Sequence, residues 1–367
     1  MPLYPAQYGN WTRRHLLLAL AYNPQLAAQN RTERVRYADP ATEFEVFRLT
    51  DPSFSSSLPP TGNRIFSRRG NSLLYLSDRS GSLQAYWIDL KSWQSRLITQ
   101  ASALDPRCVT LTPDDRSLCY VDGNRLMLCP ADGGSARQVY QLSSVSAEAA
   151  GLHVIPDGPS ALVVEGGGKV RSAPLYKGSP RTLAENAEGV LEPLPRPRRA
   201  SVLYRTLKGG IWLAHLDGSR NQKLKTQGFG AEARWSPDGR VVYYLHVPDD
   251  STKSRMLREH VPDTGEDRAV APTSQYASFS ANSDASVFVG ASESKAQPHV
   301  LLLLRSVRRE LTLCEHKASN AKMASPVFSP DSQKIFFQSD RHGKPAIYMM
   351  VVDRLVEKTE EEATGER

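Results

Sequence analysis

The fold is decided by the stretch SPVFSPDSQKIFFQSDRHGKPAIYMM, residues 325–350. Residues 329–332, Ser-Pro-Asp-Ser, are typical of a tight turn, because proline fixes φ and the Asp and Ser side chains bond their own backbone. Residues 334–338 are apolar and aromatic enough for a buried strand. A second turn follows at residues 340–343, and residues 346–352 supply another strand. The stretch therefore predicts a meander of three short strands, which cannot bury its own face.

The same unit recurs along the chain. The pattern Ser-Asp-Arg-x-Gly at 339–343 is also found at 77–81, and Pro-Asp turns precede apolar strands at 113–114 and 237–238. Weaker copies start near residues 156, 195 and 281. The period is roughly 40–50 residues, which is the range of four-stranded propeller blades. Seven such units predict an all-β protein, a seven-bladed β-propeller of four-stranded blades.

The repeated turns predict equivalent roles for their aspartates. We expect three of them to occupy one set of strand-connecting turns and two others to occupy a second set, all with structural functions. The first set is Asp114, Asp238 and Asp331, and the second is Asp78 and Asp340.

The last unit lacks a fourth strand, because the chain becomes highly charged after residue 352. Residues 45–50, Glu-Val-Phe-Arg-Leu-Thr, match the final strands of the other units. We therefore expect them to pair with the strand at 346–352 and to close the ring, which removes exposed sheet edges. The predicted organisation is an export signal and polar lead-in at 1–38, one propeller domain at 39–356 and a charged tail at 357–367.

The first thirty residues suggest export. Arg13 and Arg14 precede a short apolar run, and small residues follow it, a pattern similar to a twin-arginine signal. This predicts a periplasmic or secreted protein. The alternative is an N-terminal amphipathic helix or a tail on a cytoplasmic protein.

Composition limits the classes of partner. The formal net charge of +7 favours an acidic partner. No nucleic-acid motif is present, and no apolar run is long enough to span a membrane. Four cysteines do not make a disulfide framework. We expect them to be buried apolar residues, with a bridge among Cys108, Cys119 and Cys129 as the alternative in an exported chain.

Motifs of common enzyme classes are missing. The sequence contains no Gly-x-Ser-x-Gly, no His-Glu-x-x-His and no paired-cysteine zinc pattern. None of the eight histidines is spaced as a metal pair within one predicted element. Histidines from several blades could still form one site together at the propeller axis.

Several stretches resemble oligogalacturonate lyases, and the turn motifs are also similar to those of TolB-like propellers. The resemblance covers most of the predicted propeller. It implies a seven-bladed fold, and for the lyases it implies β-elimination of acidic pectin fragments with a manganese-type metal held by histidines and a glutamine. The stretches are Leu-Leu-Tyr-Leu-Ser-Asp-Arg at 73–79, Arg-Leu-Ile-Thr at 96–99, Trp-Ser-Pro-Asp-Gly at 235–239, Leu-Cys-Glu-His at 313–316 and Pro-Ala-Ile-Tyr at 345–348.

The sequence departs from that family where the metal would bind. A His-Pro-His-Pro stretch of the family is replaced by residues 323–326, Met-Ala-Ser-Pro, and a further family histidine falls at 274–277, Ser-Gln-Tyr-Ala. His316 persists in its Cys-x-His context. One imidazole does not hold a divalent metal, so we expect no metal site and no cofactor, with manganese only if the protein is an active lyase.

Residues near those positions are the candidate site. β-Elimination needs a cation that neutralises the uronate carboxylate and a base that removes the α-proton. His316 and Glu232 are the candidate bases. Arg205, Lys208, Arg234, Gln275 and Tyr276 are the candidate ligand-binding residues, and together with Met323 and Ser325 we expect all of them on one face of the ring.

Three functions remain open on the sequence. The first is a binding propeller for an acidic oligosaccharide or a protein partner. The second is an active oligogalacturonate lyase, a polysaccharide lyase that cleaves pectin fragments. The third is a non-catalytic interaction propeller of the TolB type.

Overall fold

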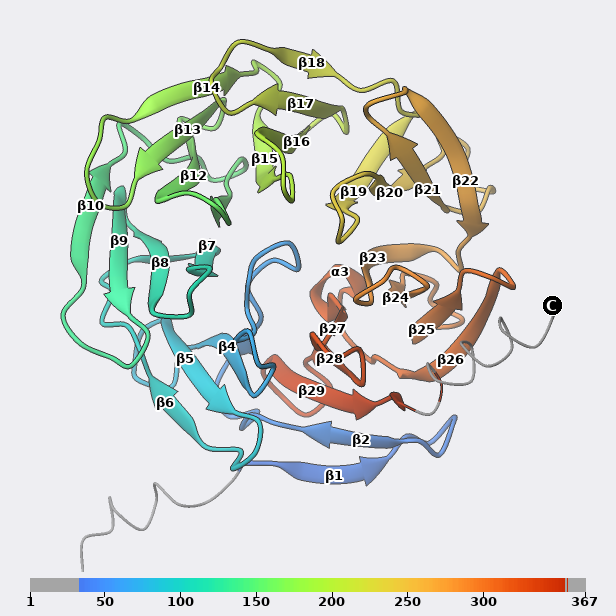
Figure 1. Cartoon of the computed structure of the whole chain (residues 1–367). Coiled ribbons are helices and arrows are strands. Elements are labelled where there is room, and N and C mark those ends of the chain that lie inside the picture. Colours follow the sequence, from blue (N-terminus) through green and yellow to red (C-terminus); the bar gives the residue numbers. More distant parts are fainter. Residues whose placement is uncertain (1–32, 354, 356–367) are drawn as a thin grey trace, which may run out of the picture.

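The computed structural model describes residues 33–353 and 355, and in these residues seven antiparallel sheets are arranged as blades around a central axis (Figure 1). The predicted seven-bladed β-propeller is therefore confirmed. In blades 1 to 6 the innermost strand lies at the axis and later strands follow outward. The second strands of the blades are rich in β-branched, aromatic and leucine residues, which suit a pleated surface buried on both faces, whereas several outermost strands are polar and exposed.

The first three blades in chain order follow the predicted pattern. Blade 1 contains β3 (Ser56–Ser57), β4 (Ser72–Ser77), β5 (Gln84–Asp89) and β6 (Ser95–Leu97). Blade 2 contains β7 (Leu104–Leu111), β8 (Ser117–Asp122), β9 (Arg125–Pro130) and β10 (Arg137–Gln141). Blade 3 contains β11 (Leu152–Val154), β12 (Ser160–Glu165), β13 (Lys169–Pro174) and β14 (Arg181–Glu185).

The next three blades have the same order. Blade 4 contains β15 (Val190–Pro195), β16 (Ser201–Thr206), β17 (Ile211–His215) and β18 (Asn221–Lys223). Blade 5 contains β19 (Phe229–Trp235), β20 (Val242–Val247), β21 (Met256–Val261) and β22 (Glu266–Pro272). Blade 6 contains β23 (Tyr276–Ala281), β24 (Val287–Ser292), β25 (His299–Leu304) and β26 (Arg309–Glu315).

Blade 7 joins the two ends of the described chain. Its inner strands are β27 (Val327–Phe328), β28 (Lys334–Ser339) and β29 (Ala346–Val351), preceded by the short helix α3 (Ala321–Ala324). β2 (Glu45–Arg48) pairs antiparallel with β29, with Phe47 opposite Met349 and Arg48 opposite Tyr348. The predicted closure of the ring by an N-terminal strand is therefore confirmed.

The N-terminal segment adds two strands to blade 7, where the sequence predicted one. β1 (Val35–Ala38) pairs with β2 and makes blade 7 a five-stranded sheet. The sequence predicted only an export signal and a polar lead-in up to residue 38, with no strand. The hairpin forms because Asp39 caps its turn, accepting hydrogen bonds from the Ala41 and Thr42 backbone N–H groups.

The aspartate turns are equivalent, as predicted. Asp114, Asp238 and Asp331 each accept a hydrogen bond from the hydroxyl two residues earlier and from the backbone N–H two residues later. In the second set, Asp78 accepts from the Ser55 N–H at 2.8 Å and Asp340 from the Ser319 N–H at 2.9 Å. These bonds fix the turns and leave the aspartates structural.

Apolar packing between blades forms the core. One cluster extends from blade 7 through blade 1 to blade 2, and includes a contact between the Phe66 and Phe336 rings at 5.2 Å. All four cysteines are buried and free, as expected for small apolar residues. No helix in the described residues is long and apolar enough to cross a membrane. The expected export signal and charged tail lie outside the described residues, apart from residues 33–38 of the lead-in.

Candidate functional site

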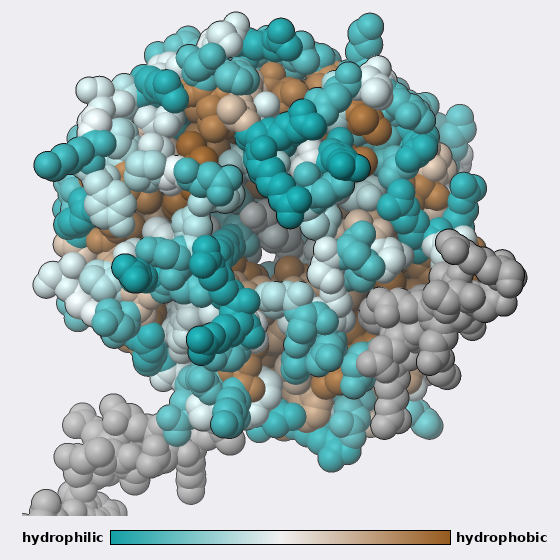
Figure 2. Space-filling model, viewed as in Figure 1, coloured by the Kyte–Doolittle hydropathy of each residue, from teal (hydrophilic) through white to brown (hydrophobic). Residues whose placement is uncertain are grey.

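A channel runs along the axis of the ring, and Figure 2 shows a narrow opening at its centre. We refer to the end at which the innermost strands begin as the upper end, and to the end at which they finish as the lower end. In an antiparallel blade the turn between the second and third strands lies at the same end as the start of the first. This topology brings the candidate residues of the sequence to the upper end: Arg205, Lys208, Glu232, Gln275, Tyr276, His316, Met323 and Ser325.

Two arginines from neighbouring blades share one carboxylate inside the channel, where Arg234 reaches it from near the lower end of β19. Arg205 Nη2, at the end of β16, lies 3.2 Å from Glu192 Oε2 of β15. Arg234 Nη1, on β19, lies 3.0 Å from the same oxygen. The three side chains are between 11% and 19% exposed, so their charges interact in a partly water-excluded setting. The cluster therefore joins blades 4 and 5 through charge.

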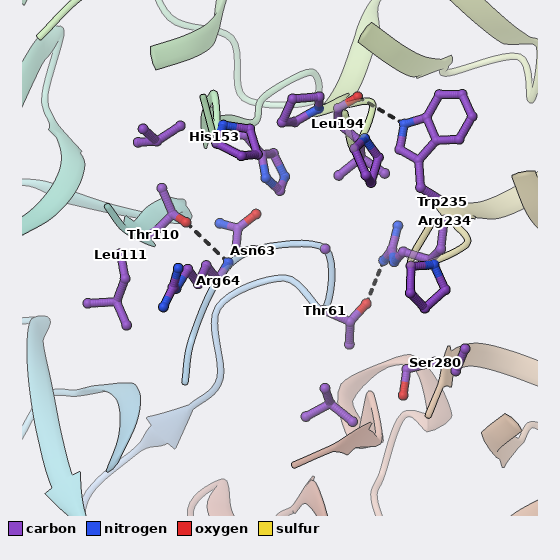
Figure 3. Close-up of a pocket in the computed structure, with 18 of the residues that line it drawn as sticks. Thr61, Asn63, Arg64, Thr110, Leu111, His153, Leu194, Arg234, Trp235 and Ser280 are labelled. Atoms are coloured by element: carbon purple, nitrogen blue, oxygen red, sulfur yellow. Dashed lines mark hydrogen bonds between the residues drawn. The ribbon is translucent and has the colours of Figure 1, made fainter. Parts of the chain in front are cut away.

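Arg234 extends the cluster in two further directions. Its Nη2 lies 3.1 Å from Glu232 Oε2 and also donates a hydrogen bond to Thr61 Oγ1. Thr61 belongs to the loop between β3 and β4, which enters the channel from blade 1 (Figures 1 and 3). The same guanidinium thus connects blades on different sides of the axis.

β-Bulges position the two carboxylates. The register of β15 against β16 shifts between Leu191 and Leu194, and that of β19 against β20 shifts between Gly230 and Glu232. Glu192 has φ +46°, in the left-handed region, although it is neither glycine nor asparagine. Such a conformation costs about 1–2 kcal/mol and is often found where a side chain is aimed at a functional site. The bulge turns Glu192 toward the two guanidinium groups.

The pKa values of the two carboxylates are shifted in opposite directions. Burial alone would raise the pKa of Glu192, but Arg234 and Arg205 outweigh it and hold that pKa at about 2. The pKa of Glu232 is raised, mainly by burial. The charge of Arg234 opposes this rise without cancelling it, and the negative charge of Glu192 adds to it. Glu192 is therefore the permanent counterion, and Glu232 is the carboxyl group that takes up a proton more readily.

His316 is held by the backbone. Its Nδ1 accepts a hydrogen bond from the Ala318 N–H at 3.0 Å, so Nε2 carries the proton and donates to the Ser292 carbonyl at 2.9 Å. The side chain is buried, and burial lowers its pKa. Both ring nitrogens are thus hydrogen-bonded to the backbone, and in this arrangement the imidazole holds the loop after β26 in place.

The remaining candidate residues are not brought into the charge cluster. Tyr276 is fully buried, and its ring packs against Gly290, where a Cβ would come within 2.2 Å of the ring. The ring is part of the apolar core shared by blades 5 and 6. Gln275 donates to the Lys253 carbonyl at the rim, at 3.4 Å. Lys208 is exposed in the turn after β16 and forms no hydrogen bond or ion pair with the described residues.

A cavity of about 400 Å³ occupies the lower part of the channel. Residues at the ends of innermost strands line it, and Figure 3 shows His153 of β11, Arg234 of β19 and Ser280 of β23 around it. Burial lowers the pKa of His153 to about 4, so its imidazole is neutral near pH 7.

Sequence reasoning missed Glu192, His153 and Thr61. The pair Glu192-Pro193 at the start of an innermost strand was the available signal, because a residue before proline is restricted and is often found at an irregularity. His153 gave no signal beyond its residue type. Thr61 gave none, because only the closed ring brings residue 61 beside residue 234.

The comparisons with known proteins point to one group. No protein-family model matches the chain. The chain is 22% identical to an oligogalacturonide lyase of Pectobacterium atrosepticum and 22% identical to an oligogalacturonate lyase of Dickeya dadantii, over 86% of this chain and 95% of each relative.

The comparison with solved structures also finds oligogalacturonate lyases. An oligogalacturonate lyase in complex with manganese superposes with a TM-score of 0.78 at 23% identity, covering 87% of this chain and 96% of that one. An oligogalacturonate lyase from Vibrio parahaemolyticus gives a TM-score of 0.78 at 20% identity, covering 88% and 97%. The resemblance that the sequence motifs indicated is confirmed over most of the chain, and at this level of identity the structural likeness establishes the fold.

Metal-ligating side chains matter here because one of these solved structures holds manganese. Residues 33–353 and 355 contain no group of three or more His, Cys, Asp or Glu side chains that could hold a metal. His316 offers no free nitrogen, and Glu192 is engaged by two arginines. The chemistry proposed below therefore uses only the side chains of this chain.

Proposed function

We propose that the protein binds an acidic oligosaccharide at the upper end of its channel, without a metal. The observation that carries the proposal is the pair of guanidinium groups, Arg205 and Arg234, that share the single strongly ionised carboxylate of Glu192. The pKa of Glu232 is raised, so its negative charge is the less persistent one. The two guanidinium groups therefore offer positive charge that a uronate carboxylate would complement, most fully when Glu232 is protonated.

Two lysines extend this positive character at the rim. Lys208 is exposed in the turn that follows Arg205. Lys322 is exposed on α3, and its charge is close enough to Glu232 to lower that group's pKa in part. A linear acidic ligand would then place one carboxylate near the arginines and others near the lysines. The similarity to oligogalacturonate lyases supports a galacturonate oligomer as the ligand.

Calorimetry with a galacturonate trimer tests the proposal. We expect binding without manganese and about a twofold to fivefold loss of affinity in Lys208→Ala, the range for one exposed charge pair. Lys177→Ala is the matched control, because Lys177 is also exposed but lies in the turn between β13 and β14 at the lower end. Trimer binding that is absent, or that requires manganese, would contradict the proposal.

One observation favours a second function, that of an active lyase. Glu232 has a raised pKa and lies 3.1 Å from Arg234. A general base works best when its pKa approaches the working pH, and a guanidinium can neutralise the uronate carboxylate and so acidify the α-proton. Glu232 would then take that proton as the bond to the leaving glycosidic oxygen breaks, which leaves an unsaturated uronate.

The ultraviolet absorbance of unsaturated uronates tests this function. An active lyase would increase the absorbance of an oligogalacturonate solution, and Glu232→Gln would abolish the increase while trimer binding persists. An absorbance that does not change, with intact trimer binding, would favour the binding function over the lyase. If neither binding nor absorbance is seen, an interaction propeller that recognises a protein partner is favoured.

We also propose export through the twin-arginine pair Arg13 and Arg14. A reporter fused to the native N-terminus should reach the periplasm, and replacement of both arginines by lysine should keep it in the cytoplasm. Cytoplasmic retention of the native fusion would contradict export.

A further inference from the structure

The lower part of the channel has a composition unlike that of the upper charge cluster. The cavity there is lined by residues from all seven blades, and its described lining contains no Asp or Glu. Arg64, Arg234 and His153 supply its basic groups. Five prolines give it an apolar rim: Pro113, Pro156, Pro195, Pro197 and Pro237.

Three residues that line this cavity carry buried polar atoms without partners. His153 Nε2, Ser280 Oγ and Arg234 Nε make no hydrogen bond with the described residues, and the three residues are only 6%, 7% and 9% exposed. More than nine in ten buried polar groups in native proteins are satisfied, and an unsatisfied one is unfavourable. Three such atoms, on lining residues from three different innermost strands, point to a molecule that pairs with them after a small side-chain adjustment.

The chemistry of these atoms indicates an anion. Arg234 Nε and the Ser280 hydroxyl are donors, and a neutral imidazole can present an N–H from Nε2. No carboxylate of the described lining competes for them. The prolines and the side chain of Trp235 offer apolar surface to the rest of the ligand. A volume of about 400 Å³ is at the small end of the range for ligand sites, which limits the occupant to a single compact ring.

We propose that the lower cavity is a second binding site, for a compact organic carboxylate, distinct from the oligosaccharide site at the upper end. His153, Ser280 and Arg234 hold the carboxylate, and the proline rim and Trp235 contact the ring. A carboxylate anion can accept hydrogen bonds from all three donors at once. Hydrogen bonds to a neutral ring alcohol would be weaker, because they are not charge-assisted.

The channel loop from blade 1 closes one side of this site. Asn63 Nδ2 donates to the Val109 carbonyl at 2.7 Å, and the Arg64 N–H donates to Thr110 Oγ1 at 3.1 Å, so the loop is fixed against β7 (Figure 3). Arg234 belongs to both sites, since its Nη groups bond Glu192, Glu232 and Thr61 and its side chain also lines the lower cavity. An occupant below would therefore influence ligand affinity above.

Ligand-observed NMR on the full chain tests the second site. The probes are galacturonate and benzoate, which are carboxylates on a polar and an apolar ring, with galactose as the uncharged counterpart. We expect both carboxylates to bind and galactose not to bind. His153→Leu and Ser280→Val should each weaken carboxylate binding about tenfold or more, the effect of losing one charge-assisted hydrogen bond.

Controls separate this site from the upper one and from misfolding. His153→Leu removes an unsatisfied buried atom and keeps a similar volume, so its melting temperature should not fall; a functional role predicts lost binding with retained stability. Lys208→Ala should leave benzoate binding unchanged, because the upper site is proposed for galacturonate. The proposal is overturned if neither carboxylate binds, if the two cavity variants bind as the native chain does, or if Lys208→Ala weakens benzoate binding as much as they do.

Discussion

The guanidinium of Arg234 on β19 lies 3.0 Å from the carboxylate of Glu192 on β15, so the innermost strands of blades 4 and 5 are joined by an ion pair inside the channel. Arg205 shares the same carboxylate from β16. Glu192 is therefore the negative group that the two buried guanidinium groups share, and these two ion pairs offset the cost of its left-handed backbone conformation.

Glu192→Gln should destabilise the protein strongly. The amide keeps the shape of the side chain but leaves Arg205 and Arg234 without their shared charge, and breaking a buried ion pair by removing one partner costs about 3 kcal/mol. Urea unfolding measures the change. Glu185→Gln is the control, because Glu185 is largely exposed in β14 and should change stability by less than about 0.5 kcal/mol. Equal stability of the two variants would show that the cluster does not hold blades 4 and 5 together.

Removal of residues 1–50 should open the ring. This deletion takes away β1 and β2 and exposes the edge of β29, whose unpaired N–H and C=O groups can pair with another chain. We expect aggregation, measured by light scattering, and a lower melting temperature. Removal of residues 1–32 is the matched control, because it deletes no described strand. A soluble 51–367 fragment with native stability would contradict the closure argument.

Asp340→Ala should lower the free energy of unfolding by about 1 kcal/mol, because the turn loses the hydrogen bond from the Ser319 N–H. Asp78→Ala should do the same in blade 1, through the Ser55 N–H. Chemical denaturation measures both, and Asp157→Ala, at an exposed turn position, serves as the comparison. Native stability with lost oligosaccharide binding would assign these aspartates to a site rather than to the scaffold.

The sequence predicted the parts of the molecule that local chemistry determines. Turn residues and alternating apolar stretches recur in each blade, so blade number, the closing strand and the roles of Asp114 and Asp340 could be read from them. The candidate site was predicted less well. Arg205, Arg234 and Glu232 do meet, but Tyr276 is a core residue because Gly290 makes room for its ring. Thr61 and Glu192 were missed because their contacts depend on ring closure and on a bulge, neither of which leaves a local pattern.

The last prediction concerns pH and the upper site. Burial raises the pKa of Glu232, so as pH falls this carboxyl takes up a proton before an ordinary glutamate does, while the carboxylates of a galacturonate trimer, with ordinary values near 3.5, stay ionised to lower pH. Protonation removes a negative charge 3.1 Å from Arg234, so affinity for the trimer should rise as pH falls. Glu232→Gln should bind more tightly than the native chain at pH 7 and should lose most of the pH dependence. Calorimetry at pH 5, 6 and 7 measures both chains, and an affinity of the native chain that does not change over this range would show that Glu232 does not control the charge of the site.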